Sequence, residues 1–307
     1  MAKINYLILA HKNPEQLERM IKTLNDEHSC FYIHIDKKTD INLFSSLKKI
    51  NTVTFIENRV DNVWGDFSSV IATINLVEVA LKKEKKGMFI LLSGMDYPIK
   101  PKQAIHSFIN LNSDKNFIDM EPANEVWDSF NRRSHYYKVS LSSTRGDFVL
   151  LKGLNLRTLK YFFLGKIPLH ELIKIISKKR KLHLNLDFYG GSQWWAMNFN
   201  TLTKVQDYII TNKATLYDYF KYSLLPDEWF FQSIIHHLKK TDLSIRTEKS
   251  LTYVNWTRKN CNLPVTFVNQ DIDELMNQKE GLLFARKFDI EMDLHILDSI
   301  DKNFTPQ

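Results

Sequence analysis

The sequence has few of the residues that mark disulfide-rich or linker-divided proteins: two cysteines, nine glycines and eight prolines in 307 residues. Cys30 and Cys261 lie too far apart in sequence to suggest a disulfide framework or a metal-binding knuckle. The glycines and prolines are scattered, so no flexible linker divides the chain. We therefore expect one domain over residues 1–307, with an N-terminal half at 1–115 and a second half at 116–307 that ends in a C-terminal wrap.

Long hydrophobic runs are also absent. No apolar stretch reaches the roughly 20 residues that a membrane-spanning helix needs, and the run at Ile4–Ala10 is too short for a signal sequence. With so few cysteines, a reducing cytoplasm is the expected compartment. The chain is 44% hydrophobic and 25% charged, which is enough apolar material for a core and no signature of disorder.

Basic residues outnumber acidic ones, and 42 Lys and Arg against 35 Asp and Glu give a formal net charge of +7. Such a balance attracts anions, and nucleic acid, acidic lipid and nucleotide diphosphates all qualify. No motif with a known nucleic-acid docking geometry is present, so we expect no nucleic-acid partner. A basic nucleic-acid binder would instead show steep salt-dependent retention on DNA.

The first hundred residues alternate between strand and helix patterns. Apolar runs typical of buried parallel strands recur at Ile4–Ala10, 31–35, 53–56 and 88–92. Asn13 and Pro14 are suited to begin a helix as its cap and first residue, and residues 67–81 have helical apolar spacing. This rhythm predicts an α/β fold with a doubly wound, mostly parallel sheet and helices on both faces.

Polar residues follow three of these expected strands. His11 follows the first strand, Asp36 the second, and the segment from Ser93 to Asp96 the fourth. In doubly wound sheets, ligands bind beyond the carboxyl ends of the strands. These side chains are suited to a nucleotide, although polar residues also simply end strands.

Residues 147–182 are both apolar and basic. An amphipathic, cationic element of this kind can lie on an anionic membrane surface. The alternative, which we prefer, is a core-packed helix pair with a solvated basic end formed by Lys178, Lys179, Arg180 and Lys181.

The segment Pro226-Asp227-Glu228 begins an expected helix with two carboxylates. Acidic residues in a first turn are ordinary, because the helix dipole favours them. The flanking residues are strongly apolar, however, and include Trp229 and two phenylalanines. A carboxylate among aromatic side chains loses solvation, so its pKa rises towards that of a useful general base.

Two further features suit sugar-nucleotide chemistry. Gly190 and Gly191 would let the backbone approach a ligand closely, and the following Ser192-Gln193-Trp194-Trp195 offers flat aromatic faces, although a turn before a core strand explains the same pattern. Cationic pairs occur at 258–259 and 286–287, either as solvated surface charge or as counter-charges for a departing diphosphate. Metal-ligand spacing is absent, and the only Asp-X-Asp, at 271–273, resembles a helix start, so we expect no metal.

These motifs resemble those of the core-2/I-branching enzymes, a family that includes β-1,6-N-acetylglucosaminyltransferases and peptide-O-xylosyltransferases. The matching segments occur in the family's order along nearly the whole chain, at 7–12, 32–38, 64–69, 92–100, 190–195, 226–231, 253–256 and 283–289. No single segment is decisive. Eight segments in the same order are hard to explain by chance.

The resemblance implies a GT-A-like fold, a UDP-sugar donor, inversion at the anomeric carbon and no metal ion. It makes 1–115 the nucleotide-binding half and 116–307 the acceptor and catalytic half, with Glu228 as the base. It implies that the nucleotide contacts are His11, Asp36, Arg59, Ser93, Asp96 and Lys287. It implies that the sugar and acceptor contacts are Ser192, Gln193, Trp194, Asp227 and Trp256.

Two features depart from the family pattern. The position expected for a diphosphate-binding arginine falls near Asn262, so we nominate Arg258 and Lys259, which directly follow the Trp motif as cations do in the xylosyltransferase branch. The stem, anchor and many cysteines of vertebrate members are missing, which fits a cytosolic enzyme that builds a surface polysaccharide or glycolipid. The sequence therefore predicts a glycosyltransferase that transfers GlcNAc or xylose. The alternative is a non-catalytic carbohydrate-binding protein on the same fold.

Overall fold

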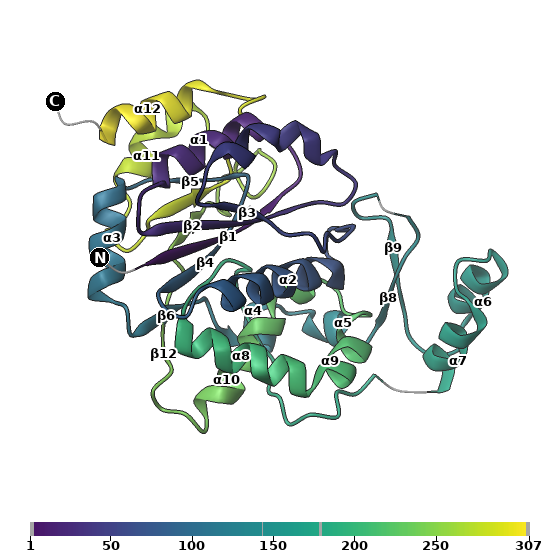
Figure 1. The fold of residues 1–307 in the computed structure, drawn as a ribbon. Coiled ribbons are helices and arrows are strands. Elements are labelled where there is room, and N and C mark those ends of the chain that lie inside the picture. The colour runs from purple at the N-terminus through teal and green to yellow at the C-terminus, as the bar shows by residue number, and fades with distance from the viewer. Residues whose placement is uncertain (1–2, 143, 178–179, 305–307) are drawn as a thin grey trace.

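A seven-stranded sheet forms the centre of the protein in a computed structural model that describes residues 3–142, 144–177 and 180–304 (Figure 1). The strand order is β12-β6-β11-β4-β1-β2-β3. Their bounds are β1 (Ile4–Ala10), β2 (Ser29–Ile35), β3 (Val53–Phe55), β4 (Met88–Ser93), β6 (Lys115–Phe117), β11 (Ala196–Asn198) and β12 (Arg246–Glu248). Neighbouring strands run parallel except where β11 pairs with β4 and β6. The predicted α/β fold with a mostly parallel sheet is confirmed.

Helices cover both faces of this sheet, as the sequence predicts (Figure 1). One face packs against α1 (Pro14–Leu24), the 3-10 helix η1 (Ile41–Lys49), α3 (Lys102–Leu111), α11 (Ile272–Met276) and α12 (His295–Phe304). The other face packs against α2 (Phe67–Lys83), α8 (Phe199–Thr211), α9 (Lys213–Phe220) and α10 (Phe230–Lys239). Side chains alternate along a strand, so Tyr6 and Ile8 enter the first core while Leu7 and Leu9 enter the second.

The strand order reverses between β1 and β4. From β1 the sheet extends through β2 and β3 on one side and through β4 on the other. Gly94, just after β4, donates its N–H to the carbonyl of Leu9, and a Cβ at Gly94 would come within 3.2 Å of the Cβ of Ala10. The carboxyl ends of β1 and β4 therefore meet closely at the point where ligands bind in such sheets.

Smaller sheets flank the central one. Strands β5 (Asp96–Pro98), β14 (Phe284–Arg286) and β13 (Thr252–Val254) form a three-stranded sheet, and β7 (Glu121–Pro122) pairs with β10 (Tyr189–Gly190). Between β7 and the next hairpin lie the short helices α4 (Ala123–Val126) and α5 (Phe130–Ser134). The β5-β14-β13 sheet places the C-terminal motif beside the end of β4, because Arg286 pairs with Asp96.

A hairpin and a helix pair stand apart from the main body. Strands β8 (Tyr137–Ser140) and β9 (Phe148–Leu151) lead into α6 (Leu156–Phe163) and α7 (Leu169–Ser177), and the two helices project from the body (Figure 1). They share a small core of their own. Several other large apolar side chains on the pair are exposed, so the preferred prediction of a core-packed helix pair is correct for one face of the pair only. Of its basic end, Lys178 and Lys179 lie outside the described residues.

The helix start at Pro14 was predicted correctly, but the role of Asn13 was not. Asn13 has φ 53° and ψ 62°, and its side chain makes no capping hydrogen bond. Instead its Nδ2 donates to Oδ1 of Asp289 at 2.7 Å. Asn13 therefore joins the N-terminal strand end to the C-terminal motif rather than capping α1.

Within the described residues, no helix is both long enough and apolar enough to span a bilayer.

Candidate active site

The segment Pro226–Glu228 forms a separate 3-10 turn, η2. Leu225 before it has φ 50°, and Trp229 after it is non-helical, with φ −147° and ψ −2°. The helix α10 therefore begins only at Phe230, and the prediction of one helix starting at Pro226 was wrong. Asp227 and Glu228 therefore precede α10 and do not belong to its first turn.

A buried arginine from a distant part of the chain holds Glu228. Nη1 of Arg133, on α5, donates to Oε2 of Glu228 at 2.6 Å, and the guanidinium lies 3.9 Å from the centre of the Trp127 ring. The side chain of Glu228 is 27% exposed and that of Arg133 is 13% exposed. Glu228 is thus fixed by a cation and still open to a molecule that approaches from solvent.

The two carboxyls of this turn respond differently to their surroundings. Burial raises the pKa of Asp227 to about 7, with a further contribution from the charge of Glu228. Burial also raises the pKa of Glu228, while Arg133 opposes that rise. Because the hydrogen-bonded ion pair favours the charged form of Glu228, we infer that Asp227 holds the proton near neutral pH and Glu228 is ionised.

Removal of Arg133 should shift the pH profile of any reaction that uses Glu228 as a base. Arg133 lowers the pKa of Glu228, so Arg133→Gln should raise it and move the acid limb of kcat/KM to higher pH. Activity should then fall more at pH 6 than at pH 8. The control is Arg132→Gln, an exposed neighbour on the same helix. An equal loss at every pH would show that Arg133 acts only through stability.

The two glycines next to the turn are required by steric contact. The N–H of Gly191 donates to the carbonyl of Glu228 at 2.9 Å. A Cβ at Gly190 would lie 2.3 Å from the Trp127 ring, and one at Gly191 would lie 2.1 Å from the carbonyl oxygen of Asp119. The close approach predicted for this pair is therefore an approach to the protein's own chain.

A second arginine, Arg286, lies behind the turn. Its guanidinium covers the Trp194 ring at 4.1 Å, and its Nη1 lies 3.5 Å from Oδ1 of Asp96. Asp96 has no exposed surface and accepts hydrogen bonds from the N–H and hydroxyl of Ser93. Asp96 and Trp194 are both buried here, and their expected direct contacts with a ligand stay predictions. Both residues position Arg286, whose positive charge favours the ionised form of Asp227.

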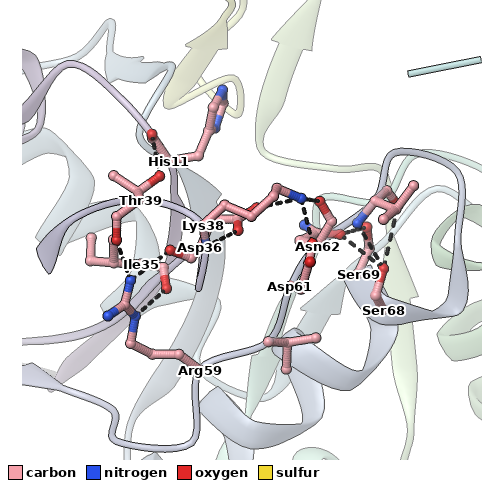
Figure 2. A network of polar contacts seen from close by, with 12 residues as sticks. His11, Ile35, Asp36, Lys38, Thr39, Arg59, Asp61, Asn62, Ser68 and Ser69 are labelled. Carbon is pink, nitrogen blue, oxygen red and sulfur yellow. Dashed lines mark hydrogen bonds and ion pairs between the residues drawn. The ribbon is translucent and has the colours of Figure 1, made fainter. Parts of the chain in front are cut away.

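The ends of β1 and β2 meet in a polar network (Figure 2). The hydroxyl of Thr39 donates to the carbonyl of His11 at 2.8 Å, and Oδ1 of Asp36 accepts the N–H of Lys38. Arg59 donates to the backbone carbonyls of Ile35, Asp36 and Thr39. His11 and Asp36 thus lie close together, as predicted. Arg59 binds the backbone of the loop that carries Asp36, and its expected contact with the nucleotide stays a prediction.

Lys287 lies in a crowded group of positive charges. Desolvation lowers its pKa, and the charges of Arg145, Arg286 and Lys12 lower it further. Arg145 comes from the β8–β9 hairpin, and its guanidinium lies 4.6 Å from the centre of the Trp64 ring. Nζ of Lys12 is bound to Asp289 at 2.6 Å. Positive charge from three distant segments therefore gathers at one place, which suits a strongly negative ligand.

The cations nominated after the Trp motif lie differently. The guanidinium of Arg258 donates to Asp271 at 2.8 Å and to Glu274 at 2.7 Å. These contacts neutralise the charge of Arg258 and make Asp271 an ion-pair partner of that arginine. Lys259 is exposed. Arg258 is therefore poorly placed to neutralise a diphosphate.

The remaining expected sugar contacts are accessible to different degrees. Trp256 follows β13 and is 58% exposed, so a face of its ring can receive a sugar. Ser192 and Gln193 are half-buried next to the glycine pair, and the carbonyl of Ser192 accepts a hydrogen bond from Gln232 at 2.7 Å.

In the parts of the chain that the structure describes, no three His, Cys, Asp or Glu side chains come close enough together to hold a metal ion.

Two residues of this site, Arg133 and Arg145, were missed from the sequence, and Arg286 was noted only as part of a cationic pair. Arg133 and Arg145 lie in the irregular region between the two halves of the family pattern, where no periodic signal marks them. Arg286 stands next to the predicted Lys287, and its apolar neighbours could have indicated a buried cation. A buried arginine needs a carboxylate partner, which sequence spacing did not identify.

A family model described as "Core-2/I-Branching enzyme" matches residues 4–278. Xylosyltransferase 2 of Rattus norvegicus is 24% identical over 98% of this chain and 33% of its own length. A xylosyltransferase of Ciona intestinalis is 23% identical over 97% of this chain and 34% of its own length. The chain thus spans about a third of the curated relatives that it matches.

Among solved structures, a Bacillus anthracis protein assigned as a glucose-1-phosphate thymidylyltransferase aligns with 92% of this chain and 100% of its own, with a TM-score of 0.35 and 7% identity. So remote a similarity does not bear on function.

Proposed function

The chain belongs to the core-2/I-branching enzyme family, and we propose that it is an inverting glycosyltransferase that moves a sugar from a UDP-sugar to a hydroxyl acceptor. The acceptor is a carbohydrate or glycolipid, as in the synthesis of a surface polysaccharide or glycoconjugate. The observation that carries this proposal is the partly exposed Glu228 carboxylate, bound by Arg133 and next to Asp227, whose pKa burial raises to about 7.

In the proposed reaction, Glu228 accepts the proton of the acceptor hydroxyl. The acceptor oxygen attacks the anomeric carbon from the face opposite UDP, and the bond between that carbon and the β-phosphate oxygen breaks. UDP leaves with the additional negative charge. His11 and Asp36 lie at the strand ends where the nucleotide would bind, and Lys287 with Arg145 would stabilise the diphosphate.

Fixed cations would take the place of a divalent ion in this reaction. The charges of Arg145, Arg286 and Lys12 lower the pKa of Lys287, which supports a site adapted to a diphosphate. We expect a chelator such as EDTA to leave the initial rate of transfer unchanged. The check is to measure that rate with EDTA and with added Mn²⁺; strict dependence on Mn²⁺ would contradict the proposed counter-charge.

Two donors are in question, UDP-xylose and UDP-N-acetylglucosamine. The curated relatives quoted above are named xylosyltransferases, and the Trp256-Thr257-Arg258-Lys259 segment resembles that branch of the family. We therefore place UDP-xylose first. UDP-N-acetylglucosamine or another UDP-hexose is the runner-up donor.

A panel of UDP-sugars tests the proposal and its non-catalytic alternative together. UDP release by the purified chain should be fastest with one donor and should increase when a hydroxyl acceptor is added. A carbohydrate-binding protein without activity would bind sugars in calorimetry but release no UDP from any donor. Lack of release, with donor binding intact, would favour that alternative.

A further inference from the structure

We propose that the projecting helix pair α6–α7 docks on an anionic lipid surface, with its apolar side chains in the interface and its cations against the headgroups. This inference does not depend on the proposed reaction. It concerns a surface on the far side of the β8–β9 hairpin from the central sheet (Figure 1).

The first observation is the apolar surface of the pair. Leu156 is 88% exposed and Phe163 is 80% exposed. The exposed apolar side chains are Leu156 and Phe163 on α6, Leu164 in the turn, and Leu169, Ile173 and Ile176 on α7. Large apolar side chains that are exposed together on one projecting element mark an interaction site.

The exposed residues follow helical spacing. On α7, Leu169, Ile173 and Ile176 are separated by four and three positions, so they share one face. Leu172 and Ile175 lie on the adjoining face and are buried in the small core with the hairpin. The helix therefore packs one apolar face on its own core and leaves Leu169, Ile173 and Ile176 between 41% and 60% exposed.

The second observation is charge. Lys152, Arg157, Lys160 and Lys166 are exposed on or beside the pair, and Glu171 is the only carboxylate in the sequence from 148 to 182. On α6, Lys160 stands between Leu156 and Phe163 on the same face. Apolar and cationic side chains that alternate in this way suit the boundary between acyl chains and anionic headgroups.

The third observation is a basic cleft next to α7. It has a volume of about 580 Å³, and its lining includes His170, Lys174, Arg180, Lys181 and His183, with Asp218 as the acidic member. Lys174 and Asp218 form an ion pair. The side chains of the lining that can carry charge are thus mainly basic, so the cleft continues the cationic surface on which anionic headgroups would lie.

Charge also favours lipid over a second copy of this chain. Two copies that met through α6–α7 would bring the same set of cations together, and like charges across an interface are unfavourable. An anionic bilayer satisfies the apolar and the cationic side chains at once.

The test is sedimentation of the full chain with phosphatidylcholine vesicles, with and without phosphatidylglycerol. We expect binding only when the anionic lipid is present, and weaker binding at high salt. A double variant Arg157→Gln and Lys160→Gln should weaken binding roughly 25-fold, at about fivefold per charge. The control is Lys48→Gln with Lys49→Gln, an exposed pair on η1.

A second variant tests the apolar contribution. Leu156→Ser with Phe163→Ser should weaken vesicle binding at least about tenfold and leave the thermal midpoint unchanged, since both side chains are exposed. Leu111→Ser with Leu243→Ser, exposed elsewhere on the molecule, should have no effect on binding.

Two results would overturn the proposal. One is failure of the wild-type chain to sediment with anionic vesicles. The other is a dimer, detected by light scattering, that the Leu156→Ser and Phe163→Ser changes dissociate, because the face would then be an interface between copies.

Discussion

Glu228→Gln should reduce the rate of sugar transfer by about 10²–10⁴-fold, the range typical of a lost general base. Glutamine has nearly the same shape but cannot accept the proton of the acceptor hydroxyl. It can still accept a hydrogen bond from Arg133, so the turn should keep its geometry. The rate should be measured with saturating donor and acceptor, and UDP affinity should be measured separately by calorimetry.

UDP affinity should remain close to that of the wild type, because Glu228 is proposed to act on the acceptor hydroxyl and not on the diphosphate. Glu280→Gln, an exposed carboxylate elsewhere in the chain, is the matched control and should leave the rate unchanged. Transfer at the wild-type rate by Glu228→Gln would remove Glu228 as the base and end the proposed mechanism.

Lys287→Ala should weaken UDP binding by about 10–100-fold, since hydrogen bonds to charged groups contribute about 1.5–3 kcal/mol. Lys287 is surrounded by positive charge that lowers its pKa, so an anion relieves repulsion among these groups as well as binding Lys287 itself. Calorimetric titration with UDP, at two salt concentrations, measures the effect and its electrostatic part.

Three further variants locate the counter-charge. Arg145→Ala should also weaken UDP binding, because Arg145 lies close enough to Lys287 to influence its pKa. Lys279→Ala, an exposed lysine that was not placed in the candidate site, is the control. Lys259→Ala tests the cation originally nominated from the Trp motif. If Lys259→Ala weakens binding and Lys287→Ala does not, the diphosphate lies at the Trp motif instead.

The central sheet could be predicted from the sequence because its strands are continuous apolar runs. All seven residues of β1 are buried, and such a run fits a parallel strand covered on both faces. The short strand β12 could not be predicted, because its residues Arg246–Glu248 are polar and it is defined only by pairing with β6 at the sheet edge. The local hydrophobic pattern predicts buried strands. It does not predict polar strands that form only by pairing with a strand far away in the sequence.

The residues of the candidate site that belong to local sequence motifs could be predicted. Those that join the site through contacts between distant parts of the chain could not. Glu228 and Lys287 were nominated from local segments. Arg133 was missed because 95 residues separate it from Glu228, and only the folded chain brings them together. The outer face of the helix pair was misjudged because its apolar spacing is the same whether that face meets a core or remains exposed.

The steric fit of Gly191 affects how substitutions at this position should be interpreted. The Cβ of an alanine there would collide with the Asp119 carbonyl. The collision would disturb the hydrogen bond that the Gly191 N–H donates to the carbonyl of Glu228. A scan that finds Gly191→Ala inactive would thus report a displaced carboxylate, even if no sugar ever touches that residue. Loss of activity in a Gly191 variant is therefore not evidence that the substrate binds at this residue.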